Sequence, residues 1–230
     1  MCLILQIETA TTSCSVALTK DGKVISVKQI NQRNIHAEVI TIFIDELVAA
    51  SGITYNNLDA IVVSSGPGSY TGLRIGVSTA KGLCFALDKP LIAVETLASM
   101  ASGILNRDGN HQEGGLLLCP MIDARRMEVF MAVFNTNGEE IIPTSAEIID
   151  ENSFNNLLET NKILFFGDGA EKCQAVLGEN PNAIFFPAFV NSAADLTQKA
   201  LEKFNQKQFE DVAYFEPYYL KDFIAGKKKN

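Results

Sequence analysis

The stretch Ser-Ser-Gly-Pro-Gly-Ser-Tyr-Thr-Gly-Leu-Arg-Ile-Gly, residues Ser64–Gly76, joins a predicted strand to a predicted helix. The nearly continuous apolar run Leu58–Ser65 is typical of a strand that is covered on both faces. Apolar residues at helical spacing predict a helix from about Thr71 to Leu87. A strand, a glycine-rich turn and a helix in this order indicate an α/β fold.

The turn inside this stretch has two interpretations. Amide groups at the start of the helix, with Arg74 one turn inside it, can hold an anion. The same residues also describe a tight turn in which Ser69 or Thr71 caps the helix. The glycine spacing matches neither a dinucleotide-binding fingerprint nor a P-loop, so both interpretations stay open.

Three other places carry groups that could contact an anion or a nucleotide. Glu8–Ser13 is a hydroxyl-rich hairpin, and Asp123–Val129 puts two arginines and an acid in the corresponding turn of the second half. Asp168 follows a strand, between two glycines, and is a predicted helix cap. At the last two places a charged hairpin corner and a simple capped turn are the alternatives. The candidate contacts are Thr9, Thr11, Gly68, Ser69, Thr71, Arg74, Asp123, Arg125, Gly167, Asp168 and Gly169.

The helix after the glycine-rich turn carries a narrow apolar seam with residues alternately four and three apart. Gly72, Gly76 and Ala80 are small residues on the same side, which would let another helix approach closely. A second helix, predicted at about His36–Ala50, is apolar nearly all round and must be covered on several sides. We expect an association surface on these two helices; the alternative is that both are internal core. The expected surface residues are Ile40, Phe43, Leu47, Gly72, Leu73, Gly76, Val77, Ala80 and Cys84.

The order of three strands, helix, strand and helix occurs twice, which indicates an internal duplication. Asn106–Gly115 is the predicted linker between lobes at 1–105 and 106–230, with residues from about 206 onward able to pack back on the first lobe. Two such lobes leave a cleft between them, where ligands usually bind. The first lobe has seven basic and eight acidic residues, and the second has 12 and 19. We expect protein contacts on the less charged first lobe.

Composition excludes several classes of protein. With 47% hydrophobic and 20% charged residues the chain is not disordered, and its net charge of −8 disfavours unaided nucleic-acid binding. Five scattered cysteines form no C-x-x-C pair, and the two histidines, His36 and His111, lie far apart, so neither a disulfide framework nor a metal pair is indicated. The opening residues predict a strand, not a signal peptide, and no apolar run approaches the roughly 20 residues of a membrane helix. We expect a soluble, cytoplasmic protein without membrane contact, whose basic tail Lys227–Lys229 is at most a supplementary contact.

Three motifs together resemble the TsaB (YeaZ) family. They are Ile7–Leu18 (Ile-Glu-Thr-Ala-Thr-Thr-Ser-Cys-Ser-Val-Ala-Leu), Ser65–Leu83, which contains most of the stretch quoted first, and Asp123–Val129 (Asp-Ala-Arg-Arg-Met-Glu-Val). They cover most of the first lobe and the start of the second. The resemblance implies an actin-like ATPase (ASKHA) fold, an α/β architecture of two duplicated βββαβα lobes around a cleft.

The resemblance also implies a function. Members of this family are the non-catalytic subunit of the bacterial machinery that puts a threonylcarbamoyl group on the adenosine beside the anticodon, in tRNAs that read ANN codons. The implied partners are the catalytic relative TsaD, the ATPase TsaE and, through the complex, tRNA, with a homodimer when the chain is alone. The family's dimer surface is built from first-lobe helices, which correspond to residues 36–50 and 71–87 here.

The chain lacks groups that its active relatives use. TsaD carries a metal-binding H-x-x-x-H motif, and this chain has His36 and Ile40 there. Sugar kinases and actin use Asp-x-Gly in the first hairpin, where this chain has Glu8 and Ala10. We therefore expect no catalytic residue, no metal and no cofactor, with any ATP bound by the complex and not hydrolysed by this chain. The alternative is an ATPase or phosphotransferase of the same fold that acts alone; a metallopeptidase would lack its ligands.

Overall fold

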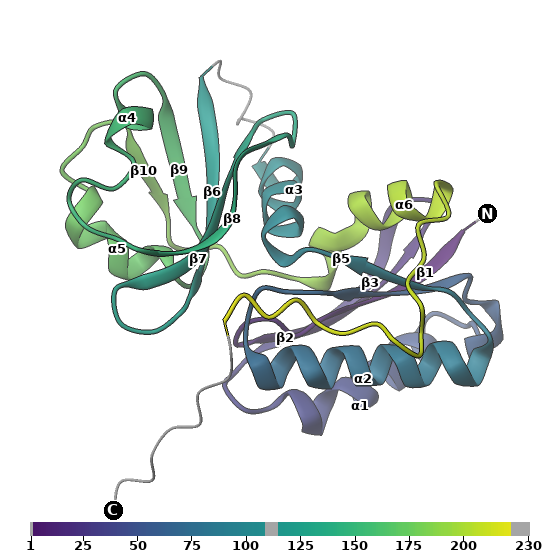
Figure 1. The fold of residues 1–230 in the computed structure, drawn as a ribbon. Helices are drawn as coiled ribbons and strands as arrows, with labels where there is room; N and C mark the ends of the chain where they lie inside the picture. Colours follow the sequence, from purple (N-terminus) through teal and green to yellow (C-terminus); the bar gives the residue numbers. More distant parts are fainter. Residues whose placement is uncertain (1, 109–114, 222–230) are drawn as a thin grey trace, which may run out of the picture.

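The computed structural model describes residues 2–108 and 115–221, which form two lobes, each built on a five-stranded mixed sheet (Figure 1). The first sheet has the strand order β3-β2-β1-β4-β5. Its strands are β1 Leu3–Glu8, β2 Ser13–Lys20, β3 Lys23–Asn31, β4 Ala60–Ser64 and β5 Leu91–Val94. The second sheet has the order β10-β9-β6-β7-β8. Its strands are β6 Leu116–Asp123, β7 Glu128–Asn135, β8 Glu140–Ile148, β9 Lys162–Phe166 and β10 Ala183–Phe186.

The two sheets have the same topology, so the duplication predicted from the sequence is confirmed. In each sheet three antiparallel strands are followed by two strands that run parallel to the first. The helices between them are α1 His36–Ala50, η1 Tyr55–Asn57 (a 3₁₀ helix), α2 Tyr70–Leu87, α3 Thr96–Asp108, α4 Asn155–Leu158, α5 Ala170–Leu177, η2 Ala193–Leu196 (3₁₀) and α6 Thr197–Asn205. The sequence does not predict β10, a four-residue strand at the edge of the second sheet.

Each sheet is covered on both faces, which explains why the inner strands β1, β4, β6 and β9 are buried along nearly their whole length. Helices α1 and α2 pack on one face of the first sheet, and η2 with α6 packs on the other, through Leu196 and Ala200. In the second lobe α4 and α5 cover one face and α3 covers the other, through Leu97, Met100 and Ile104. The lobes therefore exchange their last helices: α3 precedes the second sheet but packs on it, and α6 follows that sheet but packs on the first. The chain returns to the first lobe by Asn191, which accepts hydrogen bonds from Thr11 and Gln29, earlier than the sequence suggested.

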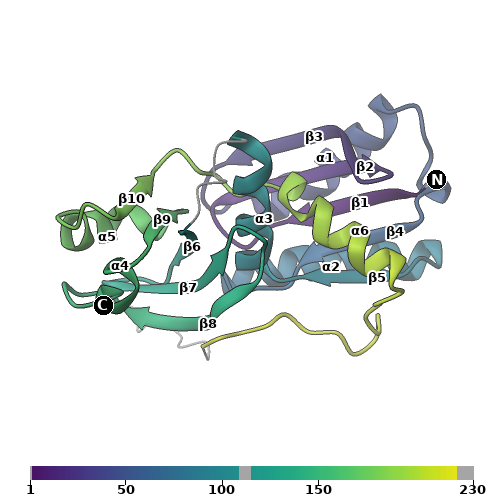
Figure 2. The same ribbon diagram turned by 90° about the horizontal axis from the view of Figure 1, so that it is seen from above.

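The final described segment runs from α6 back along the first lobe toward the second lobe (Figure 2). Glu210 forms an antiparallel bridge with Leu91, and the Tyr218 amide donates to the Ser65 carbonyl at 2.7 Å. The Lys81 ammonium donates to the Ala213 carbonyl at 3.1 Å, which fastens the segment beside α2. The segment thus stays ordered without a helix or strand of its own.

Some expectations fall outside the described residues or change in detail. The predicted linker Asn106–Gly115 is helical at its start, because α3 continues to Asp108. His111 and the tail Lys227–Lys229 lie outside the described residues. In the part that the structure describes, no helix is long and apolar enough to span a membrane.

Candidate functional site

The β1–β2 turn of the first lobe is buried. Glu8, the last residue of β1, is 0% exposed. Its Oε1 atom accepts a hydrogen bond from the Ala10 amide at 2.6 Å and another from the Ser64 hydroxyl at 2.9 Å, whereas Oε2 has no partner. Burial raises the pKa of the Glu8 carboxyl to about 7, although these hydrogen bonds oppose the shift. The carboxyl therefore points into the lobe and is partly protonated near neutral pH.

Three glycines, Gly68, Gly72 and Gly76, leave room for this turn. A Cβ atom added at Gly72 would collide with the Thr9 carbonyl oxygen, and one at Gly76 would collide with the Thr9 hydroxyl. A Cβ atom at Gly68 would likewise meet the backbone and side chain of Ala10. The small residues of α2 therefore let the helix lie against its own β1–β2 turn, not against a partner helix, which corrects the expectation from the sequence.

The expected association residues are mostly in the core of the first lobe. Each of the following is buried by this chain itself: Ile40, Leu47, Gly72, Leu73, Gly76, Val77, Ala80 and Cys84. Phe43 is half-buried. The apolar residues of α2 recur at a spacing that puts them on one face of the helix, and such a face must be covered. The sheet of the same lobe is the nearest apolar surface, so the seam packs against it. The prediction that these residues form an association surface is therefore wrong for the buried members of the set.

The outer faces of α1 and α2 have a different set of apolar residues. Ile42 is 52% exposed and Phe85 is 86% exposed. Gly82, one turn before Phe85, has no atom within 4 Å of the position that a Cβ would take. The seam in the sequence does not point to these residues, because Phe85 stands one residue after the seam residue Cys84 and so about 100° around the helix from it.

The start of α2 uses its amide groups and its arginine internally. The Ser69 hydroxyl caps the helix by accepting from the Gly72 amide at 3.2 Å, and the Ser69 amide donates to the Ala10 carbonyl at 2.6 Å. The Arg74 guanidinium lies 4.3 Å from the centre of the Tyr70 ring and donates to the Tyr219 hydroxyl at 3.1 Å. The predicted Ser69 cap is confirmed, and the exposed Thr71 is not the cap.

His36 has a structural role. It is buried at the first position of α1, and its Nε2 atom lies 2.9 Å from the Thr11 carbonyl oxygen. Thr11, also buried, donates its hydroxyl to the Asn191 side chain at 2.5 Å. Among the residues that the structure describes, no group of three or more His, Cys, Asp or Glu side chains could hold a metal ion. His36 thus ties the helix to the β1–β2 turn.

The candidate contacts in the second lobe lie in two neighbouring turns, the β6–β7 turn and the turn between β9 and α5. Asp168 does not cap α5, because Gly169 occupies the cap position; its carboxylate accepts from the Asp123 amide at 3.0 Å instead. Partial desolvation in this turn raises the pKa of the Asp168 carboxyl, although the side chain is exposed on one side and the Asp123 amide opposes the shift. Asp123 itself is exposed and forms an ion pair with Lys172. A Cβ atom at Gly167 would meet the Met121 carbonyl, so the two glycines of this turn permit close packing on β6.

The β6–β7 turn contains two arginines in the left-handed region of backbone conformation. Arg125 has φ 70° and Arg126 has φ 48°. For a residue with a Cβ this conformation costs about 1–2 kcal/mol, and hairpins normally avoid the cost with Asn-Gly or Asp-Gly. The β2–β3 turn of this chain does so with Asp21-Gly22. Both arginine side chains are exposed at the tip of the hairpin.

A cavity of about 530 Å³ lies where the exchanged helices meet. Its lining includes Gln29 of the first sheet, Arg107 of α3 and Asp195 of η2. Arg107 donates to both carboxylate oxygens of Asp195, at 2.8 and 2.7 Å. None of the candidate anion contacts predicted from the sequence lines this cavity. The structure therefore places those contacts in two groups, one at the β1–β2 turn and the start of α2, and one at the β6–β7 turn and the turn between β9 and α5.

The chain is similar to proteins of one bacterial pathway. Residues 23–225 match the family model described as TsaD: tRNA N6-adenosine threonylcarbamoyltransferase. The tRNA threonylcarbamoyladenosine biosynthesis protein TsaB of Haemophilus influenzae is 30% identical over 98% of this chain and 96% of its own length. The Escherichia coli protein of the same name is 29% identical over 98% of this chain and 97% of its own length.

The similarity to the catalytic proteins is shorter. The tRNA N6-adenosine threonylcarbamoyltransferase of Staphylococcus haemolyticus is 38% identical, but over 42% of this chain and 33% of its own length.

Solved structures have the same fold. YeaZ from Pseudomonas aeruginosa matches with a TM-score of 0.80 at 24% identity, over 96% of this chain and all of that one. An activator of 2-hydroxyisocaproyl-CoA dehydratase from Clostridium difficile, solved with bound ADPNP, matches with a TM-score of 0.52 at 8% identity, over 91% of this chain and 98% of that one. The expected actin-like α/β fold is confirmed. By its family model and its full-length relatives, the chain belongs to the TsaB (YeaZ) family of tRNA threonylcarbamoyladenosine biosynthesis proteins.

Proposed function

We propose that this chain is the non-catalytic subunit of a complex that makes threonylcarbamoyladenosine in tRNA, and that it binds a catalytic TsaD-type protein through the outer faces of α1 and α2. The observation that carries the proposal is Phe85, a phenylalanine with 86% of its surface exposed on α2. Exposed aromatic side chains are enriched at protein interfaces, and the open space at Gly82 lets another backbone come close. Full-length similarity to TsaB proteins supports the pathway.

The lack of catalysis is supported by three side chains. His36 donates or accepts within its own lobe at the Thr11 carbonyl, and Ile40, where a second metal ligand would stand, is buried in the core. Glu8 is directed inward, with Ser64 and Ala10 as its partners. Groups engaged in this way hold the fold together and are not available to a substrate.

The remaining parts of the proposal concern partners. ATP is bound by the assembled complex and hydrolysed by a TsaE-type ATPase, not by this chain, because Ala10 and the glycine turn fill each other's space where a phosphate would need room. tRNA is bound by the complex, which acts in the cytoplasm. In isolation the chain pairs with itself through the surface that the catalytic partner otherwise covers.

The test is a mixing experiment between this chain and a bacterial TsaD protein, followed by size-exclusion chromatography with light scattering. Phe85→Glu should raise the dissociation constant of the complex at least about tenfold, because a charge replaces a central aromatic contact. The same variant should lower the yield of threonylcarbamoyladenosine in a reconstituted reaction. Its melting temperature should stay that of the wild type, since Phe85 contributes little to the monomer core.

Ile148→Glu is the matched control. Ile148 is 73% exposed, at the end of β8, so the substitution adds the same charge to the second lobe, outside α1 and α2. Unchanged association in Phe85→Glu, or an equal loss in both variants, would contradict the proposed surface. Charges at Val77 or Ile40 would not test it, because both side chains are buried and the protein would unfold.

A further inference from the structure

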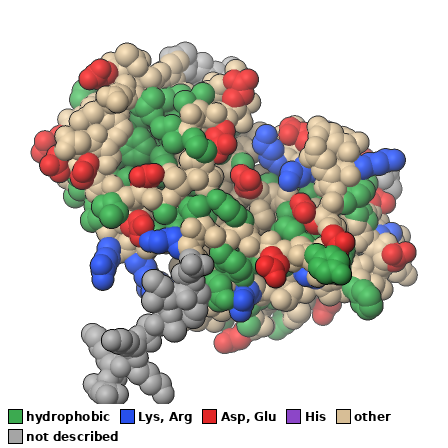
Figure 3. Space-filling model, in the orientation of Figure 1, with side chains coloured by type: hydrophobic (Ala, Val, Ile, Leu, Met, Phe, Trp, Pro, Cys, Tyr) green, Lys and Arg blue, Asp and Glu red, His purple; other side chains and the backbone are tan. Residues whose placement is uncertain are grey.

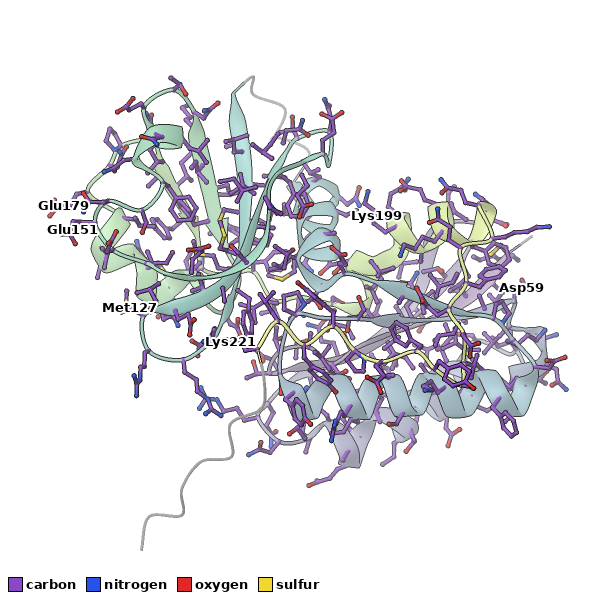
Figure 4. All side chains as sticks on the ribbon, viewed as in Figure 1. Asp59, Met127, Glu151, Glu179, Lys199 and Lys221 are labelled. Carbon is purple, nitrogen blue, oxygen red and sulfur yellow. The ribbon has the colours of Figure 1, made fainter. Side chains whose placement is uncertain are left out.

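The β6–β7 turn presents two cations whose charge nothing in the described chain satisfies. The acids beside them are already paired: Asp123 with Lys172, and Glu128 with Lys221 at 2.5 Å. No ion pair or side-chain hydrogen bond within the described residues engages Arg125 or Arg126. Met127 and Lys221 are labelled in Figure 4 at the lower edge of the second lobe, and Figure 3 shows Lys and Arg side chains gathered at that edge.

The backbone makes this arrangement more than a chance pair of surface arginines. Both residues occupy left-handed conformations that glycine and asparagine adopt at lower cost, so the turn is less stable than an Asn-Gly turn would be. Strained residues that persist in a native structure point to a functional constraint. The short hairpin also places the two exposed arginines on adjacent residues of its turn.

The guanidinium geometry indicates which ligand fits. A planar fork of donors matches the oxygens of phosphates and carboxylates. The second lobe carries an excess of acidic residues, so a polyanion is repelled by most of its surface and can approach where the acids are neutralised by lysines. We propose that Arg125 and Arg126 contact the phosphate backbone of the tRNA on which the complex acts. The proposal rests on the function proposed above, because the pathway supplies the RNA.

The experiment uses a transcript of a tRNA that reads an ANN codon, with the full-length chain both alone and in complex with a TsaD protein. Arg125→Asn/Arg126→Gly replaces the strained turn by a standard hairpin turn and removes both guanidiniums. The affinity of the complex for the transcript at low salt should fall about tenfold. The slope of log K against log salt should become shallower by about 2, one for each lost phosphate contact. The melting temperature of the variant should rise, which shows that misfolding is not the cause of the weaker binding.

Lys20→Ala/Lys23→Ala is the control, because it also removes two exposed cations, from the β2–β3 hairpin of the first lobe. Equal losses of RNA affinity in the two variants would mean that only the net charge matters, and would overturn the proposal. So would an unchanged salt slope in the turn variant. Weaker association with TsaD at unchanged RNA affinity would identify an acidic protein surface as the true ligand of the arginines.

The two proposals fail separately. Association of the two proteins, measured without RNA, tests the surface on α1 and α2. RNA binding, measured at protein concentrations that keep the complex assembled, tests the arginine turn.

Discussion

Glu8 and Asp123 end the first strands of two sheets that have the same strand order, but the two lobes place them in opposite environments. Glu8 is fully buried, and this desolvation raises its pKa to about 7. Asp123 is exposed and is paired with Lys172. The turn after Glu8 consists of threonines and an alanine packed against glycines, whereas the turn after Asp123 carries two exposed arginines. Duplication thus preserved the topology while one turn became core and the other became surface.

The largest effect is expected where the buried turn meets α2. Gly72→Ala should destabilise the protein by about 3 kcal/mol, because its Cβ would collide with the Thr9 carbonyl, which is backbone and cannot rotate away. Urea denaturation measures the free energy of unfolding. Gly76→Ala is the matched control: its Cβ meets the Thr9 hydroxyl, so Thr9→Ala should rescue it but should not rescue Gly72→Ala. Rescue of both variants would show that the turn is not packed as described.

The second effect is a pH dependence that belongs to the first lobe. The folded-state pKa of Glu8 is about 7 and its unfolded value is 4.5. Between these values the folded state holds a proton that the unfolded state has lost, so stability should fall by about 3 kcal/mol as the pH rises from 4.5 past 7. Glu8→Gln mimics the protonated acid and should remove this fall. Unfolding free energies measured from pH 4.5 to 8 test it, and identical pH profiles of variant and wild type would contradict it.

The third effect has the opposite sign and belongs to the second lobe. Arg125→Asn/Arg126→Gly should stabilise the protein by about 1–2 kcal/mol, because it relieves two residues with Cβ atoms from left-handed conformations. Thermal unfolding monitored by circular dichroism checks it. Asp21→Ala/Gly22→Ala in the β2–β3 turn, the converse change, should destabilise. A loss of stability in the arginine variant would mean that the guanidiniums support the fold itself.

The smallest expected effect on stability comes from the exposed acid Asp123, and it gives the most direct comparison with Glu8. Asp123→Asn should cost less than about 1 kcal/mol, because an exposed ion pair with Lys172 contributes little in water. Its unfolding free energy, compared with that of Glu8→Gln at pH 8, measures how far the two lobes have diverged. Since Asp123 also accepts from the Arg125 amide at 3.0 Å, the RNA affinity of this variant shows whether that contact helps to orient the arginines.

The sequence by itself predicted most elements and the family. Apolar runs identified the strands, helical spacing identified α1 and α2, and the glycine-rich turn with the two other motifs indicated the actin-like fold. These signals are local, because periodicity and turn residues act within one element. Two features with weak local signals were not predicted correctly. Strand β10 is a short strand at the edge of the second sheet. The helix cap at Asp168 was inferred from residue type alone, but its carboxylate accepts a hydrogen bond from the Asp123 amide instead.

Only the tertiary structure decided which surface each apolar face meets. The seam and the glycines of α2 showed correctly that something must lie close, but a pattern of small and apolar residues cannot distinguish a partner helix from the chain's own β1–β2 turn. The same holds for α3 and α6, each of which packs on the sheet of the other lobe. Hydrophobic burial is non-directional, so a sequence specifies how much of a face must leave water, and the packing of the whole chain determines what covers it.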